Sequence, residues 1–277
     1  MTNKEYKNDW VKHCLPAFLL LLMSACGSAP ARLPTAIEQA QKADQAAHRA
    51  LRDGDLKRAR ELFKQSMLMQ QALENIPETA MSAINLSSVN HKLGDEGTAL
   101  GLLDDVLADK TMLISVELRA AAAFRKGVIL ADTGKTEDAA VALQLAKQLC
   151  NAQCAFVAGM NNLQARLLLE KKDYAAALAI VKGVMNAGAE KEEQANALRL
   201  AGAAETALGL HDAALTHYTA ALELDKELAL SNRIAEDLQG ISKSLANLNR
   251  QAEAEDYAHR AASVTVAAQK LKGSTSR

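Results

Sequence analysis

The side chains of this sequence that could do chemistry are few, and their spacings match no catalytic motif. The triplet Gly134-Lys135-Thr136 has the ending of a phosphate-binding loop, but that loop needs a glycine where Ile129 stands. The histidines form no HExxH pair that would hold a zinc ion, and no serine lies in a GxSxG motif. We therefore expect no enzyme, no metal site and no cofactor.

The N-terminal segment has the pattern of an export signal. Lys4, Lys7 and Lys12 precede an apolar run over residues 14–25, which is about half as long as a membrane-spanning helix. The run ends in the small residues Ser24 and Ala25, directly before a cysteine. This ending resembles the lipobox of bacterial lipoproteins, so we expect residues 1–25 to be a signal peptide that is removed.

The same resemblance implies a covalent lipid on Cys26. In bacterial lipoproteins the cysteine sulfur receives diacylglycerol, the signal is cut before it, and the new amino group is usually acylated, with palmitate as a common chain. Gly27 stands where an aspartate would retain a lipoprotein in the inner membrane of enteric bacteria. We therefore expect the periplasmic face of the outer membrane, with residues 26–35 as a lipidated tether. The alternative is a plain secretory signal followed by an incidental cysteine.

Two further cysteines, Cys150 and Cys154, lie where one helical hairpin should give way to the next. Two thiols that flank a turn in an oxidising compartment favour a disulfide. Free thiols are the first alternative. A metal site is the second, although two cysteines alone would leave ligands missing.

The composition predicts an all-α protein. Only Pro77 of the four prolines lies beyond residue 35, and aromatic residues make up just 3% of the 277 residues, which suits closely packed helices better than sheets. The 32 basic and 33 acidic side chains nearly cancel, so the chain lacks the positive charge with which proteins bind nucleic acid. We expect no nucleic-acid partner.

A phrase of similar sequence recurs six times along the chain. Each copy contains one alanine, and successive alanines are 40, 40, 38, 37 and 40 residues apart: Ala59, Ala99, Ala139, Ala177, Ala214 and Ala254. Five residues before each alanine stands a residue suited to a helix-ending turn: Gly54, Gly94, Gly134, Lys172, Gly209 and Asn249. Twelve residues before it stands a small residue: Ala47, Ser87, Gly127, Ala165, Gly202 and Ser242. The pattern predicts hairpins of two helices that cross closely at the small residue and the alanine.

These columns resemble the tetratricopeptide repeat over residues 36–268, most closely in the fifth unit with Gly202, Gly209, Ala214, Tyr218 and Ala221. The resemblance implies an α-solenoid of about six helix-turn-helix repeats in residues 36–270, followed by a polar tail over residues 271–277. The repeat spacing exceeds the typical value of about 34, and the family's tryptophan and closing proline are absent. A generic antiparallel helix bundle is the alternative.

In proteins of this type the first helices of the hairpins line a concave groove. Residues off the packing columns are therefore groove candidates: Asn85, Arg125, Asn162, Arg166 and Arg199. Their order is similar to part of the asparagine-plus-base arrangement with which some family members hold a peptide carboxylate. An ordinary polar lining is the alternative.

The resemblance implies a membrane-anchored periplasmic scaffold that binds a protein or peptide of the cell envelope. The assembly would belong to pilus or secretion, outer-membrane or peptidoglycan machinery. Two alternatives belong to other classes. One is a peptidoglycan-processing or other envelope enzyme with a hidden site, and the other is a soluble periplasmic chaperone.

Overall fold

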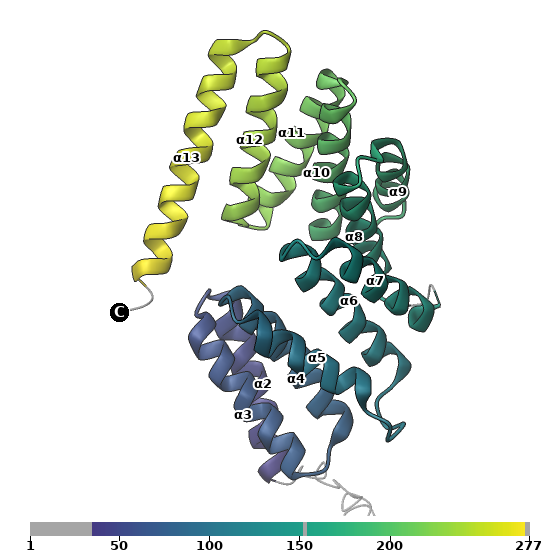
Figure 1. The fold of residues 1–277 in the computed structure, drawn as a ribbon. Coiled ribbons are helices and arrows are strands. Elements are labelled where there is room, and N and C mark those ends of the chain that lie inside the picture. Colours follow the sequence, from purple (N-terminus) through teal and green to yellow (C-terminus); the bar gives the residue numbers. More distant parts are fainter. Residues whose placement is uncertain (1–34, 152–153, 275–277) are drawn as a thin grey trace, which may run out of the picture.

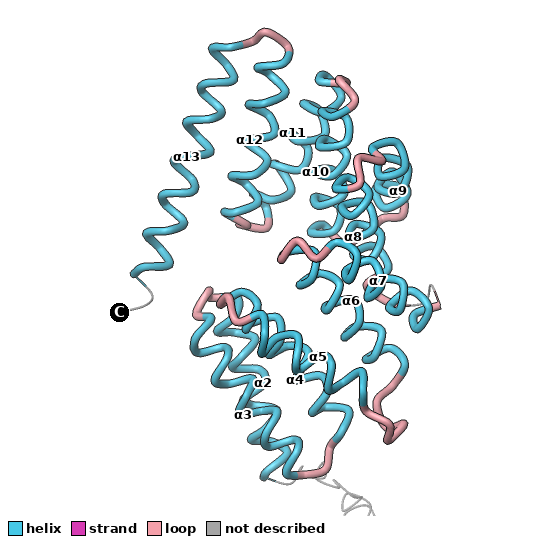
Figure 2. The backbone as a smooth tube through the Cα atoms, in the orientation of Figure 1, coloured by secondary structure: helices cyan, strands magenta, loops and turns pink. Residues whose placement is uncertain are grey.

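The fold is known from a computed structural model, which describes residues 35–151 and 154–274. The expected signal peptide, the tether up to Pro34 and the lipid site Cys26 lie outside the described residues. Within them the chain forms twelve α-helices and no strand, which confirms the all-α prediction (Figure 2). The helices are α2 (Thr35–Arg52), α3 (Leu56–Ala72), α4 (Ile76–Lys92), α5 (Glu96–Ala108), α6 (Val116–Asp132), α7 (Thr136–Cys150), α8 (Val157–Glu170), α9 (Tyr174–Asn186), α10 (Lys191–Ala207), α11 (His211–Glu227), α12 (Ser231–Asn247) and α13 (Gln251–Ser274).

Consecutive helices run antiparallel and pack in pairs, from α2 with α3 to α12 with α13 (Figure 1). Each pair also packs on the next, so that the pairs form a curved row. The first helices of neighbouring pairs are in contact, as α4 is with α6 and α10 with α12. This is the solenoid arrangement that the repeat spacing predicts.

The turn inside each hairpin contains one residue with a left-handed backbone. Four of these residues are glycines with φ between 74° and 82°, a conformation that strains other residues more. Lys172 (φ 63°) and Asn249 (φ 61°) hold the remaining two positions. Aspartates then begin three of the following helices, because the side chains of Asp55, Asp95 and Asp173 accept hydrogen bonds from backbone N–H groups of the first turn.

In all six hairpins the two helices cross closely. The six repeated alanines are all buried, with exposed fractions of 0 to 3%. A Cβ atom added to Gly127 would lie only 3.3 Å from the carbonyl oxygen of Ala139, and the Ser242 hydroxyl donates to the carbonyl of Ala254 at 2.8 Å. A larger residue at either position would push the helices apart, which explains why the column is small.

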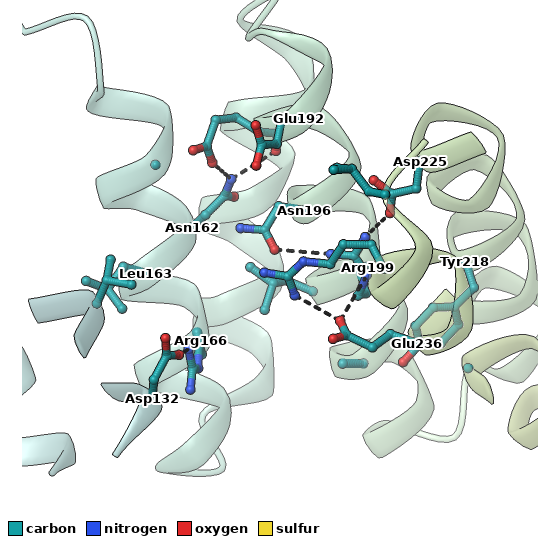
Figure 3. Close-up of a pocket in the computed structure, with 18 of the residues that line it drawn as sticks. Asp132, Asn162, Leu163, Arg166, Glu192, Asn196, Arg199, Tyr218, Asp225 and Glu236 are labelled. Atoms are coloured by element: carbon teal, nitrogen blue, oxygen red, sulfur yellow. Dashed lines mark hydrogen bonds and ion pairs between the residues drawn. The ribbon is translucent and has the colours of Figure 1, made fainter. Parts of the chain in front are cut away.

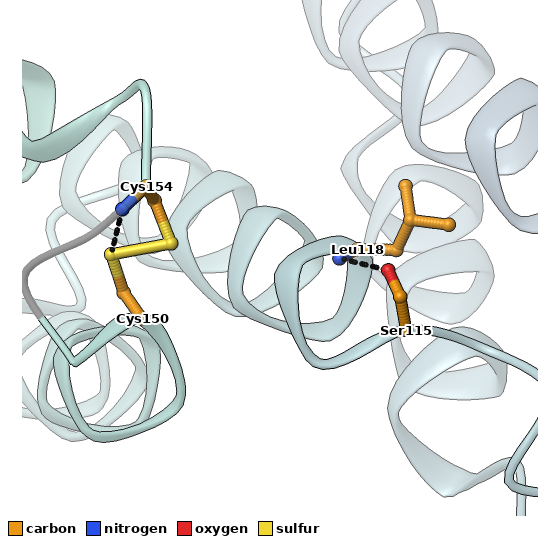
Figure 4. Close-up of a disulfide and its surroundings, with 4 residues drawn as sticks. All are labelled: Ser115, Leu118, Cys150 and Cys154. Atoms are coloured by element: carbon orange, nitrogen blue, oxygen red, sulfur yellow. Dashed lines mark hydrogen bonds between the residues drawn. A yellow bond between two sulfur atoms is a disulfide. The ribbon is translucent and has the colours of Figure 1, made fainter.

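A disulfide joins Cys150 and Cys154 at the junction of the third and fourth hairpins (Figure 4). Their Cα atoms are 5.4 Å apart. Helix α7 does not run through both cysteines, because Asn151 adopts a left-handed conformation (φ 45°) and ends it, with its N–H donating to the carbonyl of Lys147. The bond therefore closes a turn between two helices.

None of the described helices combines the length and the apolar character that spanning a bilayer would need.

Candidate functional site

A groove of about 880 Å³ lies on the inner face of α6, α8, α10 and α12. Four of the five predicted groove residues line it: Arg125, Asn162, Arg166 and Arg199. The fifth, Asn85, is not among the lining residues. It lies on α4, where its side-chain nitrogen is 3.5 Å from Nε2 of His48 on α2.

Arg125 is a largely buried cation without a direct ionic partner. Its Nε atom is buried and has no hydrogen-bond partner within the described structure. Burial lowers the pKa of Arg125, while the carboxylates of Glu192, Glu193 and Asp132 oppose that effect from a distance. The guanidinium therefore keeps hydrogen-bonding capacity that the protein itself does not use.

Asn162 stands one repeat further along the same wall of the groove. It is only 2% exposed, and its side-chain nitrogen donates to the backbone carbonyl of Glu193 at 2.9 Å and to Oε2 of that residue at 2.7 Å. These bonds fix the amide, as Figure 3 shows. Its Oδ1 atom is buried and has no hydrogen-bond partner in the described part of the chain. The groove thus contains an unused acceptor as well as an unused donor.

Arg166, unlike Arg125, is paired with carboxylates of the protein itself. It forms an ion pair with Asp132 and lies 3.6 Å from the carboxylate of Glu170. Asp132 also accepts from His91 at 2.8 Å, so it connects α4, α6 and α8. Although burial works against it, the hydrogen bonds from Arg166 and His91 hold the pKa of Asp132 below its usual value.

Arg199 belongs to a buried charge cluster that the sequence did not reveal. It donates to Asp237 at 2.8 Å and to Asp225, and these two carboxylates are 0% and 1% exposed. Glu236, which is about half exposed, lies 3.7 Å away. Burial raises the pKa of Asp237 to about 7, with Arg199 opposing the shift and the neighbouring Asp225 adding to it.

The floor of the groove at this end is the ring of Tyr218. A Cβ atom added to Gly202 would meet this ring at 2.8 Å, and one added to Gly240 would come closer still. The two glycines therefore make room for the ring between α10 and α12. Burial raises the pKa of Tyr218, so its hydroxyl stays neutral across the physiological range.

A signal for the cluster was present in the sequence. Asp225 is three residues after Leu222 and shares its buried face, and Asp237 directly precedes the buried Leu238. Acidic residues at such core positions require a cation, but the repeat pattern does not say which arginine supplies it.

The remaining candidates for chemistry are structural. Thr136 donates to the carboxylate of Glu170 at 2.6 Å, and Gly134-Lys135-Thr136 lies at the hairpin turn where α7 begins. His217 pairs with the buried Glu205 at 2.6 Å. Among the described residues no cluster of three or more histidine, cysteine or acidic side chains could hold a metal ion.

Neither a protein-family model nor a curated protein sequence matches the chain. Solved structures do match in fold. A Rap protein complexed with Competence and Sporulation Factor superposes with a TM-score of 0.69 at 14% identity, covering 86% of this chain and 67% of its own. The apo form of RapI gives 0.67 at 11% identity over 95% and 94% of the two chains.

A tetratricopeptide repeat protein from Parabacteroides merdae ATCC 43184 is also similar, with a TM-score of 0.53 at 16% identity over 86% of this chain and 87% of its own. Identities this low establish the fold alone. These superpositions, together with the hairpins, the left-handed turn residues and the column of small residues, show that this chain has the fold of tetratricopeptide-repeat proteins.

Proposed function

We propose that the protein is a lipid-anchored scaffold of the bacterial cell envelope whose groove binds a segment of a partner protein. The observation that supports this function best is the pair of unused groups in the groove, Nε of Arg125 and Oδ1 of Asn162. A buried polar atom without a partner destabilises the free protein by about 1–3 kcal/mol, so such atoms call for a specific reason. A ligand that displaces the groups covering these two atoms and completes both bonds supplies one.

A polypeptide segment matches these groups chemically. Its backbone alternates N–H donors with carbonyl acceptors, so one stretch of chain can donate to Asn162 and accept from Arg125. A side-chain or terminal carboxylate would bind the guanidinium more strongly than a carbonyl, because both partners are then charged. The groove also offers apolar contacts at Phe124, Leu163 and Leu200. The Rap protein of the same fold, solved as a complex with Competence and Sporulation Factor, supports a binding role.

The location of the scaffold rests on the sequence. The lipobox-like ending at Cys26 supports lipid attachment, and Gly27 after it supports the periplasmic face of the outer membrane. Two or three acyl chains would anchor the protein durably, whereas one would not. Within this proposal the partner belongs to an envelope assembly, and the role is binding rather than catalysis.

A capture experiment with one groove variant tests the function. The full chain with its own signal would be used to isolate partners from membranes by mild crosslinking, with the Arg125→Met variant alongside. We expect this variant to lose at least about tenfold in partner recovery, because a charged hydrogen bond is worth about 1.5–3 kcal/mol. Its melting temperature should not fall, since a buried cation without a direct partner is replaced by an apolar side chain of similar length.

Asn85→Ala is the matched control, because Asn85 comes from the same predicted column but lies outside the groove lining. It should recover partner as the unaltered protein does. Equal recovery by Arg125→Met would remove the groove from the proposal. An intact mass without acyl chains, measured on the same preparation, would remove the lipid anchor.

A further inference from the structure

Large apolar side chains are exposed along one side of the first three hairpins. Twelve large hydrophobic residues of the described chain are exposed, and half of them fall between residues 68 and 116: Leu68, Leu73, Met81, Met112, Leu113 and Val116. Met112, Leu113 and Val116 lie within five positions of the sequence, and they are 89%, 58% and 57% exposed. Three large apolar residues exposed so close together mark a surface that contacts something other than water.

The loop that carries Met112 and Leu113 is held in place by polar bonds. The Asp109 carboxylate accepts from the N–H of Thr111 at 2.9 Å, and Arg119 donates to the Asp109 carbonyl. Ile114 is buried at 6% exposure and packs into the core with the second and third hairpins. The loop is therefore attached through Ile114, while its two other apolar residues point away from the core.

All six exposed residues lie near the same edge of the solenoid. Because the helices alternate in direction, α2, α4 and α6 all begin at one edge, called the tether edge below (Figure 1). Leu73, Met112 and Leu113 lie in the loops of that edge, and the others are within two helical turns of it. The chain enters α2 at the same edge, at Thr35, only nine positions after Cys26.

We propose that the tether edge lies against the lipid bilayer and that the α5–α6 loop inserts Met112 and Leu113 into its surface. The inference rests on the lipid anchor proposed above. Nine residues span at most about 30 Å when fully extended, so an acylated Cys26 would keep the tether edge within that distance of the membrane. Apolar loop tips then gain by leaving water, in proportion to the area that they bury in the lipid.

The arrangement also fixes the orientation of the groove. An anchor at one point leaves a domain free to rotate, whereas a second contact at the α5–α6 loop, two hairpins away, restricts that rotation. The groove, which begins at α6 and extends to α12, is then held at a defined height above the bilayer.

A single fluorophore tests the insertion. In the mature chain Cys26 is acylated and the disulfide occupies Cys150 and Cys154, so Met112→Cys supplies one reactive thiol for a nitrobenzoxadiazole label. The full-length lipidated protein would be reconstituted into phosphatidylethanolamine–phosphatidylglycerol vesicles with and without nitroxide-labelled lipid. Leu210→Cys is the control, because Leu210 is 51% exposed in a hairpin turn at the opposite edge.

The expected result is a blue-shifted emission at position 112 that nitroxide lipid quenches, with neither effect at position 210. Vesicles that carry the protein but show no quenching at position 112 would overturn the loop insertion while leaving the anchor intact. Protein that does not float with the vesicles would overturn the anchor, and the inference with it.

A transfer measurement gives an independent readout on unlabelled protein. We expect Met112→Ser/Leu113→Ser to move between vesicles about tenfold faster than the unaltered protein, because two apolar contacts with the lipid are lost. Leu208→Ser/Leu210→Ser removes two exposed leucines from the opposite edge and should transfer at the original rate. Equal rates for both double variants would contradict the proposal.

Discussion

Arg199 is a single cation between two buried aspartates, so the cluster cannot be neutral when both aspartates are ionised. Burial raises the pKa of Asp237 from 3.8 to about 7, and proton uptake also relieves the excess of negative charge beside Asp225. The unfolded chain releases this proton at about pH 4, whereas the folded chain retains it up to about pH 7. The contribution of this proton to stability is therefore fully present below about pH 4 and is lost as the pH rises from there through about 7.

Asp237→Asn should make stability less dependent on pH. The amide keeps an acceptor for Arg199 but carries no charge, so the advantage of the variant over the unaltered protein should be about 2–3 kcal/mol larger at pH 8 than at pH 5. Urea unfolding at both pH values measures this. Glu236→Gln is the control, since Glu236 is about half exposed and its charge is screened by solvent. A constant difference between Asp237→Asn and the unaltered protein across this range would refute the assignment of the proton to Asp237.

Helices of this protein meet at positions that have almost no side chain. The closest contacts are those of Gly202 on α10 and Gly240 on α12, which enclose the ring of Tyr218 on α11. Neither neighbour can give way, since each belongs to a helix that packs on the other. Three helices are thus held in register by one aromatic ring.

Gly240→Ala should destabilise the protein by about 1–3 kcal/mol, because the added Cβ atom overlaps the Tyr218 ring. Gly101→Ala in α5 is the matched control, because nothing lies within 4 Å of its added Cβ atom. There the higher helix propensity of alanine should stabilise the fold by about 0.5–1 kcal/mol. Thermal unfolding of the two variants and of the unaltered protein measures both changes in stability. A gain in both would mean that the ring moves aside without cost.

At the scale of the whole molecule, the sequence predicted the hairpins well because their determinants are local. A left-handed turn residue, a small residue and an alanine are each at a fixed distance along the chain, so one pass over the sequence finds them. Four of five groove residues followed from the same register, because each first helix turns the same face inward.

Features that arise from the stacking of hairpins were not predictable in this way. The partners of Arg199 come from α11 and α12, and the apolar tether edge combines residues of α3, α4, α6 and the α5–α6 loop. Such contacts depend on the rotation between successive hairpins, which no single repeat specifies. Asn85 belongs to the predicted column, yet the groove lining begins only at α6.

The bond between Cys150 and Cys154 reports the redox state of the compartment in which a molecule folded. A chain that has been exported, acylated at Cys26 and oxidised should expose no free thiol to iodoacetamide after denaturation without reductant. A chain held back in a reducing cytosol should be alkylated at all four of its cysteines. Intact mass spectrometry separates the two populations, so the history of every molecule in a preparation can be determined from its alkylation state.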